Sequence, residues 1–172
     1  GRGAPLRQQH ARYFVALARE AGRHLLGANL VGWLDRLDQD HDNLRTALAW
    51  SIEQRDAEQS MQLAIGLTYF WYFRGHHQEA RSWRTSILEL PTSPELAPLR
   101  AELLYGSGML LLHGGEYDVA RAYLDEALLI AEQSNNPALR IPTLAMLGFV
   151  ARVQGDYGIA RGALEHGVAM AR

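Results

Sequence analysis

The chain has 172 residues, of which 48% are hydrophobic and 21% charged, with a formal net charge of -2 at pH 7. This balance is typical of a folded domain, and without a basic excess the segment is not expected to contact nucleic acid directly. All 17 basic residues are arginine and there is no cysteine. The composition therefore excludes a phosphate-loop lysine, a Schiff base, a thiol nucleophile and a thiolate metal site.

No apolar run approaches the roughly 20 residues that a membrane helix requires. We therefore expect no membrane contact and a cytoplasmic location. The N-terminal sequence has neither an initiating methionine nor the layout of a signal peptide. This predicts a fragment of a larger protein.

The first 56 residues predict a degenerate pair of helices. One is expected over about residues 5–26 and the second over about residues 33–54, with a glycine-containing loop between them. The apolar residues within 44–48 have similar residues within 124–128, which is two periods of the forty-residue repeat described below. The pair is therefore interpreted as an irregular first repeat.

From residue 75 onward the sequence repeats every forty residues. The stretches 75–90, 115–130 and 155–170 align without gaps, and each begins with glycine and has alanine at its sixth position. A glycine between two helical patterns predicts a tight turn with positive φ, and a small residue one turn later predicts a close helix crossing. The residues concerned are Gly75, Gly115, Gly155, Ala80, Ala120 and Ala160.

A partner helix is predicted before each of these glycines, over about residues 61–74, 98–114 and 141–154. Proline is favoured in the first turn of a helix, so Pro142 predicts that the last of these helices begins near Arg140. The expected fold is all-α, a right-handed α-α solenoid of about eight helices. The expected division is a single domain over 1–172, with the degenerate pair at 1–56 and repeats at 57–94, 95–136 and 137–172.

The repeated residues resemble the tetratricopeptide repeat, a helix-turn-helix unit with small residues, glycine, tyrosine and alanine at fixed places. The forty-residue period exceeds the usual length of about 34, which longer second helices and loops would explain. Two units match well, through Gly108, Gly115, Tyr117, Ala120 and Ala127 and through Gly148, Gly155, Tyr157 and Ala160.

The N-terminal half carries a second resemblance, in the stretches 7–21, 33–50 and 70–76. These are similar to the helical region that follows the ATPase module in LuxR-type, signal-transduction ATPase regulators of bacteria. The resemblance implies a region that senses an effector or a partner, while ATP hydrolysis and DNA binding belong to other domains.

In tetratricopeptide arrays the first helices of successive repeats line a concave groove. Here the groove positions are largely aromatic and apolar, which favours a partner helix, an apolar peptide or a sugar stacked on tyrosine. The alternative reading is that these residues belong to the core or are covered by a neighbouring domain. The predicted groove residues are Tyr69, Tyr72, Phe73, Tyr105, Met109, His113, Phe149 and Arg152.

Two other patterns do not predict a site. The acidic run at 38–43 lacks the glycine and the glutamate of a calcium-binding loop, so a solvated helix face is favoured. His76, His77 and His113 have neither the spacing of a zinc site nor that of a catalytic triad, so turn and surface roles are expected.

The sequence thus predicts a non-catalytic interaction or sensor domain of a bacterial ATPase-type transcriptional regulator, with no metal and no cofactor. The expected partner is a protein or peptide, which could be another domain of the same protein or a second copy of the chain. The alternative is a receptor for a small effector such as a saccharide inducer.

Overall fold

The structure is a computed structural model that describes residues 3–170, apart from the side chains of Leu164 and Met170. The residues it describes form ten α-helices and one short 3-10 helix, which confirms the predicted all-α repeat class but exceeds the expected eight helices. They divide into two compact units, which meet in sequence between Ser93 and Pro94. The outermost residues of the predicted segments 1–56 and 137–172 lie outside the described range.

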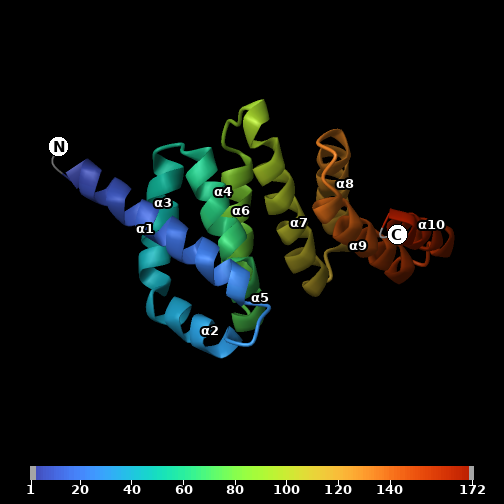
Figure 1. The fold of residues 1–172 in the computed structure, drawn as a ribbon, viewed down its shortest axis with the longest axis horizontal. Helices are drawn as coiled ribbons and strands as arrows, with labels where there is room; N and C mark the ends of the chain where they lie inside the picture. The colour runs from blue at the N-terminus through green and yellow to red at the C-terminus, as the bar shows by residue number, and fades with distance from the viewer. Residues whose placement is uncertain (1–2, 171–172) are drawn as a thin grey trace. The chain divides into compact units, whose positions relative to one another are not determined.

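The first unit contains six helices: α1 (Gly3–His24), α2 (Leu30–Gln39), α3 (His41–Glu53), α4 (Ala57–Gly66), α5 (Thr68–Arg74) and α6 (His77–Leu88). Helix α1 packs along both α3 and α4 (Figure 1). Its buried face carries Phe14 and Leu17, while Leu44, Leu48 and Leu63 fill the same core from α3 and α4. Removing these apolar side chains from water is the main stabilising contribution to this unit.

The single helix predicted over 33–54 is wrong, because the chain leaves helical geometry at Asp40 (ψ 8°) between α2 and α3. The Nδ2 group of Asn43 donates a hydrogen bond to Oδ1 of Asp40. Short polar side chains of this kind compete with the helical backbone for hydrogen bonds. The acidic run therefore marks a helix boundary instead of lying within one helix.

The helix predicted over 61–74 is also divided, because α4 begins at Ala57 and ends at Gly66 and α5 begins at Thr68. The carbonyl oxygen of Ala64 accepts hydrogen bonds from the Thr68 hydroxyl (3.1 Å) and from Nη2 of Arg84 (3.1 Å). Side-chain donors thus occupy a carbonyl that would otherwise continue the helical ladder, which favours a break at Leu67.

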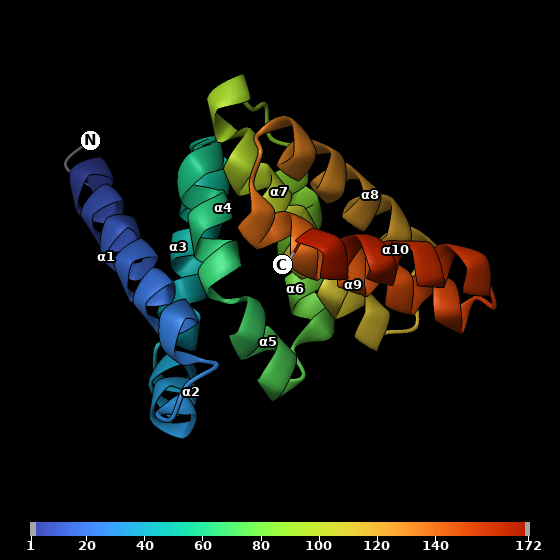
Figure 2. The same cartoon turned by 45° about the vertical axis from the view of Figure 1, so that its right-hand side comes forward.

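The second unit contains the short 3-10 helix Pro94–Leu96 followed by α7 (Ala97–His113), α8 (Tyr117–Gln133), α9 (Pro137–Val153) and α10 (Tyr157–Met170). Helix α7 pairs with α8, and α9 pairs with α10 (Figure 2). Each pair turns at a glycine in the left-handed region, Gly115 (φ 77°) or Gly155 (φ 83°). These two predicted turns are confirmed, as is the corresponding turn of the first unit at Gly75 (φ 73°).

The predicted start of α9 near Arg140 is wrong, because the helix begins at Pro137 and includes Pro142. The side chain of Asn136 accepts a hydrogen bond from the backbone N–H of Leu139 (3.3 Å), and Pro137 stands in the first turn, where proline is tolerated. Leu139 is buried against α7 and α8. Capping and burial of this first turn offset the hydrogen bond that Pro142 cannot donate.

Replacing Ala120 by leucine is expected to lower the free energy of unfolding by about 1 to 3 kcal/mol, because overpacking a filled core forces a backbone shift. Ala120 is completely buried on α8. A Cβ added at Gly108 on α7 would lie 3.4 Å from the carbonyl oxygen of Ala120, so α7 and α8 are already in close contact. Urea unfolding of this variant is compared with Ala122→Leu, which alters an exposed position of the same helix. Equal stability of the two variants would contradict the close crossing.

Candidate functional site

The three predicted groove residues of the first unit lie together on α5. Phe70 and Trp71 of this helix are fully buried and anchor it, whereas Phe73 is 42% exposed. The ring of Phe73 lies 6.4 Å from that of Tyr69 and meets that of Tyr72 edge-on at 5.2 Å. Burial raises the pKa of the Tyr69 hydroxyl. Helix α5 therefore presents a packed aromatic surface, made of Tyr69, Tyr72 and Phe73.

An arginine next to this surface holds α5 against α2. The guanidinium of Arg74 lies 2.8 Å from a carboxylate oxygen of Asp35 and 2.6 Å from one of Asp38. Two carboxylates on one guanidinium fix the end of a short helix better than a single exposed pair would. The arrangement limits how far the α5 aromatic surface can move.

In the second unit, Tyr105, Met109 and His113 follow one another at intervals of four along α7, so they share one face. Tyr105 packs against the buried cluster of Ala101, Ala131 and Leu139, and it is therefore partly a core residue. Met109 is half-buried and His113 is exposed in the last turn. Exposure to solvent thus increases along this face of α7, from Tyr105, which contacts the core, to His113 in the last turn.

Phe149 and Arg152 lie on α9, which also contacts α7. Phe149 is 44% exposed, and the guanidinium carbon of Arg152 lies over its ring, 5.3 Å from the ring centroid. This geometry is a cation-π contact. Val153, the last residue of α9, is 43% exposed. Of the eight predicted residues, three therefore lie on α5 of the first unit and five lie on α7 and α9 of the second unit.

A polar network that the sequence did not predict joins α3 to α6. A carboxylate oxygen of Glu79 lies 2.9 Å from Nε2 of His41, and the other accepts a hydrogen bond from Nε of Arg45 (3.1 Å). Burial alone would raise the pKa of Glu79, but the hydrogen bonds and charges of Arg45 and His41 outweigh it and lower the pKa to about 2. The ring of His76 lies 4.7 Å from that of His41, and its pKa is lowered by burial and by the His41 charge. Because 38 residues separate His41 from Glu79, no local pattern could reveal this network.

Neither the acidic run at 38–43 nor any other part of the described chain gathers three or more residues able to hold a metal ion. The run instead supplies the Asp38 carboxylate to Arg74 and the Asp42 carboxylate to Arg45. Within residues 3–170, no helix has the length and hydrophobicity needed to span a membrane.

Residues 99–172, almost all of the second unit, match the tetratricopeptide repeat family. The chain is also 34% identical, over 121 residues, to proteins of Mycobacterium tuberculosis and Mycobacterium bovis that are named as inferred HTH-type transcriptional regulators. That match covers 66% of this chain but only 14% of each relative, so the chain corresponds to a small part of those proteins. The two helix pairs of the second unit and their glycine turns agree with the family match, so residues 99–172 are a stretch of tetratricopeptide-like repeats.

Proposed function

We propose that this chain is a non-catalytic protein-interaction segment of a bacterial HTH-type transcriptional regulator of the signal-transduction ATPase class. The similarity to the mycobacterial proteins supports the regulator assignment, and the repeat family is a protein-interaction fold. ATP hydrolysis and DNA binding would then belong to other parts of a cytoplasmic protein. A chain with neither lysine nor cysteine is consistent with a role in binding.

The observation that carries this proposal is the exposure of two phenylalanines on first helices of helix pairs. Phe73 and Phe149 are 42% and 44% exposed. A large aromatic side chain that is only partly buried in its own unit can lose further apolar surface to a partner, and aromatic residues are enriched among those that dominate the energetics of protein interfaces. Both residues were predicted groove positions. They are the residues that we propose contact the partner most directly.

The chemistry around these rings favours a polypeptide partner over a sugar. Arg152 covers one face of Phe149, so the ring and the cation form one mixed patch. An apolar side chain together with a carboxylate would match that patch, and a partner helix or peptide supplies both. The partner would be another domain of the same protein or a second copy of the chain.

Photo-crosslinking in the full-length regulator tests the proposal. Phe73 and Phe149 are each replaced by p-benzoylphenylalanine, and we expect a crosslinked product for both, identified by mass spectrometry. Leu129 serves as the control, because it is 54% exposed but lies on α8, the second helix of its pair. Two outcomes would contradict the proposal that α5 and α9 contact the partner. One is crosslinking at Leu129 that is as efficient as at the two phenylalanines, and the other is no crosslinking at either phenylalanine.

A further inference from the structure

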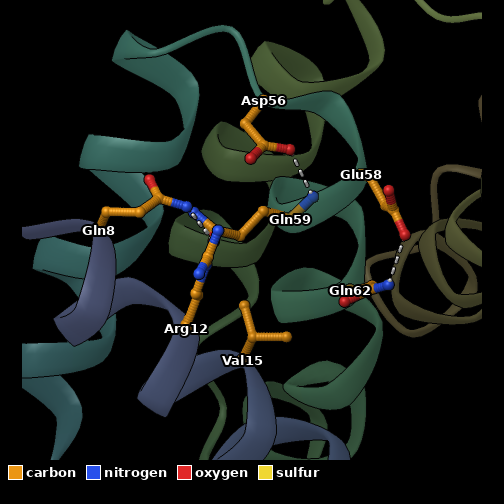
Figure 3. Close-up of a pocket in the computed structure, with 7 residues that line it drawn as sticks. All are labelled: Gln8, Arg12, Val15, Asp56, Glu58, Gln59 and Gln62. Atoms are coloured by element: carbon orange, nitrogen blue, oxygen red, sulfur yellow. Dashed lines mark hydrogen bonds between the residues drawn. The ribbon is translucent and has the colours of Figure 1, made fainter. Parts of the chain in front are cut away.

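A polar pocket lies between α1 and the beginning of α4, away from the aromatic surface of α5. Its volume is about 200 Å³, smaller than the roughly 300 to 1,000 Å³ typical of sites for drug-sized ligands. Figure 3 shows the side chains that line it, with Val15 as the apolar member. The other lining residues are Gln8, Arg12, Asp56, Glu58, Gln59 and Gln62.

The crossing of α1 and α4 explains why the pocket exists. A Cβ added to Gly66 would lie 2.4 Å from the carbonyl oxygen of Ala18, so the two backbones touch there. Gln59 lies about two turns before Gly66 along α4, and at that level long side chains face each other across the gap. The helices therefore touch at one end and diverge at the other, where the pocket opens.

Hydrogen bonds fix the floor of the pocket. The hydroxyl of Ser51 donates to the carbonyl oxygen of Ala47 (2.8 Å) and accepts from Nε2 of Gln59 (2.7 Å). The oxygen of the Gln59 amide must then face Gln8, whose Nε2 donates to it (3.3 Å). Gln59 is only 7% exposed. Because Gln8 uses its NH2 group in this hydrogen bond, its oxygen Oε1 remains an acceptor at the edge of the pocket.

The charges of the pocket are separated between the two helices. Arg12 on α1 supplies a guanidinium that has no ion-pair partner among the described residues. Asp56 and Glu58 supply carboxylates at the start of α4; Asp56 accepts the backbone N–H of Gln59 through Oδ1 (3.0 Å), which leaves Oδ2 available. Glu58 accepts from Nε2 of Gln62 (3.1 Å), which leaves the Gln62 oxygen available. The α1 wall of the pocket thus carries the cationic group, and the α4 wall carries the anionic groups.

We propose that this pocket binds a free α-amino acid. The α-carboxylate would pair with the guanidinium of Arg12, and the α-ammonium would donate hydrogen bonds to Asp56 and to the free amide oxygens. Charge-assisted hydrogen bonds of this type are stronger than neutral ones. The inference does not rest on the proposed protein-binding role, because it concerns other residues.

Ligands of other classes would pair with fewer of the charged groups that line the pocket. A simple anion would meet Asp56 and Glu58, and a simple cation would meet Arg12, so either would leave one wall unpaired. A sugar would find hydrogen-bonding groups but no aromatic ring among the lining residues on which to stack. A small zwitterion is the class that pairs both walls at once.

Isothermal titration calorimetry of the 172-residue chain tests the inference with the twenty proteinogenic amino acids as probes, each at up to roughly 10 mM, which detects dissociation constants into the millimolar range. We expect at least one to bind. For that amino acid, the N-acetyl derivative and the corresponding amine without the carboxylate are expected to bind at least tenfold more weakly. Glucose and maltose complete the panel as neutral polyols.

Two substitutions test whether the amino acid binds in this pocket. Arg12→Gln removes the cation, and Asp56→Asn removes a charge while keeping a side chain that caps a helix well. Each is expected to weaken the affinity by about 10- to 100-fold. Arg19→Gln changes an exposed arginine of the same helix that does not line the pocket, and it is expected to leave the affinity unchanged. Circular dichroism melts of all three variants monitor the fold.

The inference is overturned if no amino acid binds, if a sugar binds and the amino acids do not, or if Arg12→Gln binds as tightly as the unmodified chain. Crosslinking at Phe73 and Phe149 is unaffected by any of these results. The two proposals can therefore fail separately.

Discussion

Replacing Gly66 by alanine is expected to lower the free energy of unfolding of the first unit by about 3 kcal/mol or more. The added Cβ would lie 2.4 Å from the carbonyl oxygen and 2.5 Å from the carbonyl carbon of Ala18. These are backbone atoms, so no side chain can rotate away and α1 must separate from α4. The usual gain from replacing glycine by alanine in a helix, about 1 kcal/mol, is too small to compensate. Urea denaturation followed by circular dichroism measures the change.

Two further glycines provide a graded comparison. A Cβ at Gly22 would lie 3.3 Å from the backbone of Gly66, so Gly22→Ala is expected to cause a smaller loss. A Cβ at Gly162 on α10 would have no neighbour within 4 Å, so Gly162→Ala is expected to be neutral or stabilising. If Gly66→Ala is no more destabilising than Gly22→Ala, the close contact between α1 and α4 is wrong.

Replacing Glu79 by glutamine is expected to lower the free energy of unfolding by about 2 to 3 kcal/mol at pH 7. The side chains of Glu79 and His41 are only 17% and 14% exposed, so solvent screens this pair weakly. A pKa lowered from 4.5 to about 2 corresponds to roughly 3 kcal/mol of preferential interaction with the charged form. The amide of glutamine loses the charge and has one acceptor oxygen in place of the two that now face His41 and Arg45.

The same pKa shift predicts a pH dependence with a definite sign. Because the folded pKa of Glu79 lies below the unfolded value, its contribution is complete above about pH 4.5 and is lost as the pH falls toward 2. The lowered pKa of His76 also makes the folded state less stable as the pH falls, but this loss begins near the ordinary histidine pKa of 6.5, and His76 is present in both proteins. The stability difference between the unmodified chain and Glu79→Gln should therefore shrink as the pH falls from 4.5 to 2.

Urea unfolding at several pH values measures this difference. Glu89→Gln is the control, because Glu89 is exposed at the end of the same helix and its change should have little effect at any pH. A stability difference for Glu79→Gln that stays constant between pH 7 and pH 3 would contradict the ion pair.

Much of the second unit could be predicted from the sequence, because its determinants are local. A glycine at the start of each forty-residue repeat leads to a turn with positive φ at Gly115 and Gly155. An alanine five residues later is buried in each pair, at Ala120 and Ala160. Backbone strain and helical periodicity act within one or two turns, so a single sequence suffices to read them.

Other features depended on residues far apart in the chain. The break at Leu67 involves Arg84, whose side chain hydrogen-bonds to the Ala64 carbonyl from another helix. Pro142 lies inside α9, whose first turn is capped by Asn136 and packed through Leu139. Local propensity predicted continuation in the first case and a later start in the second. The contact of Arg84 reversed the first, and the Asn136 cap together with the packing of Leu139 reversed the second.

The sequence by itself therefore determined that this protein is all-helical and where its glycine turns fall. The tertiary structure decided that Glu79 lies next to His41 and that Arg12 and Asp56 line the same pocket. The physical reason is that helix periodicity is a property of neighbouring residues, whereas the distance between side chains on different helices depends on how closely their backbones approach. In the first unit that approach is decided at Gly66, where the absence of a Cβ lets α4 touch α1.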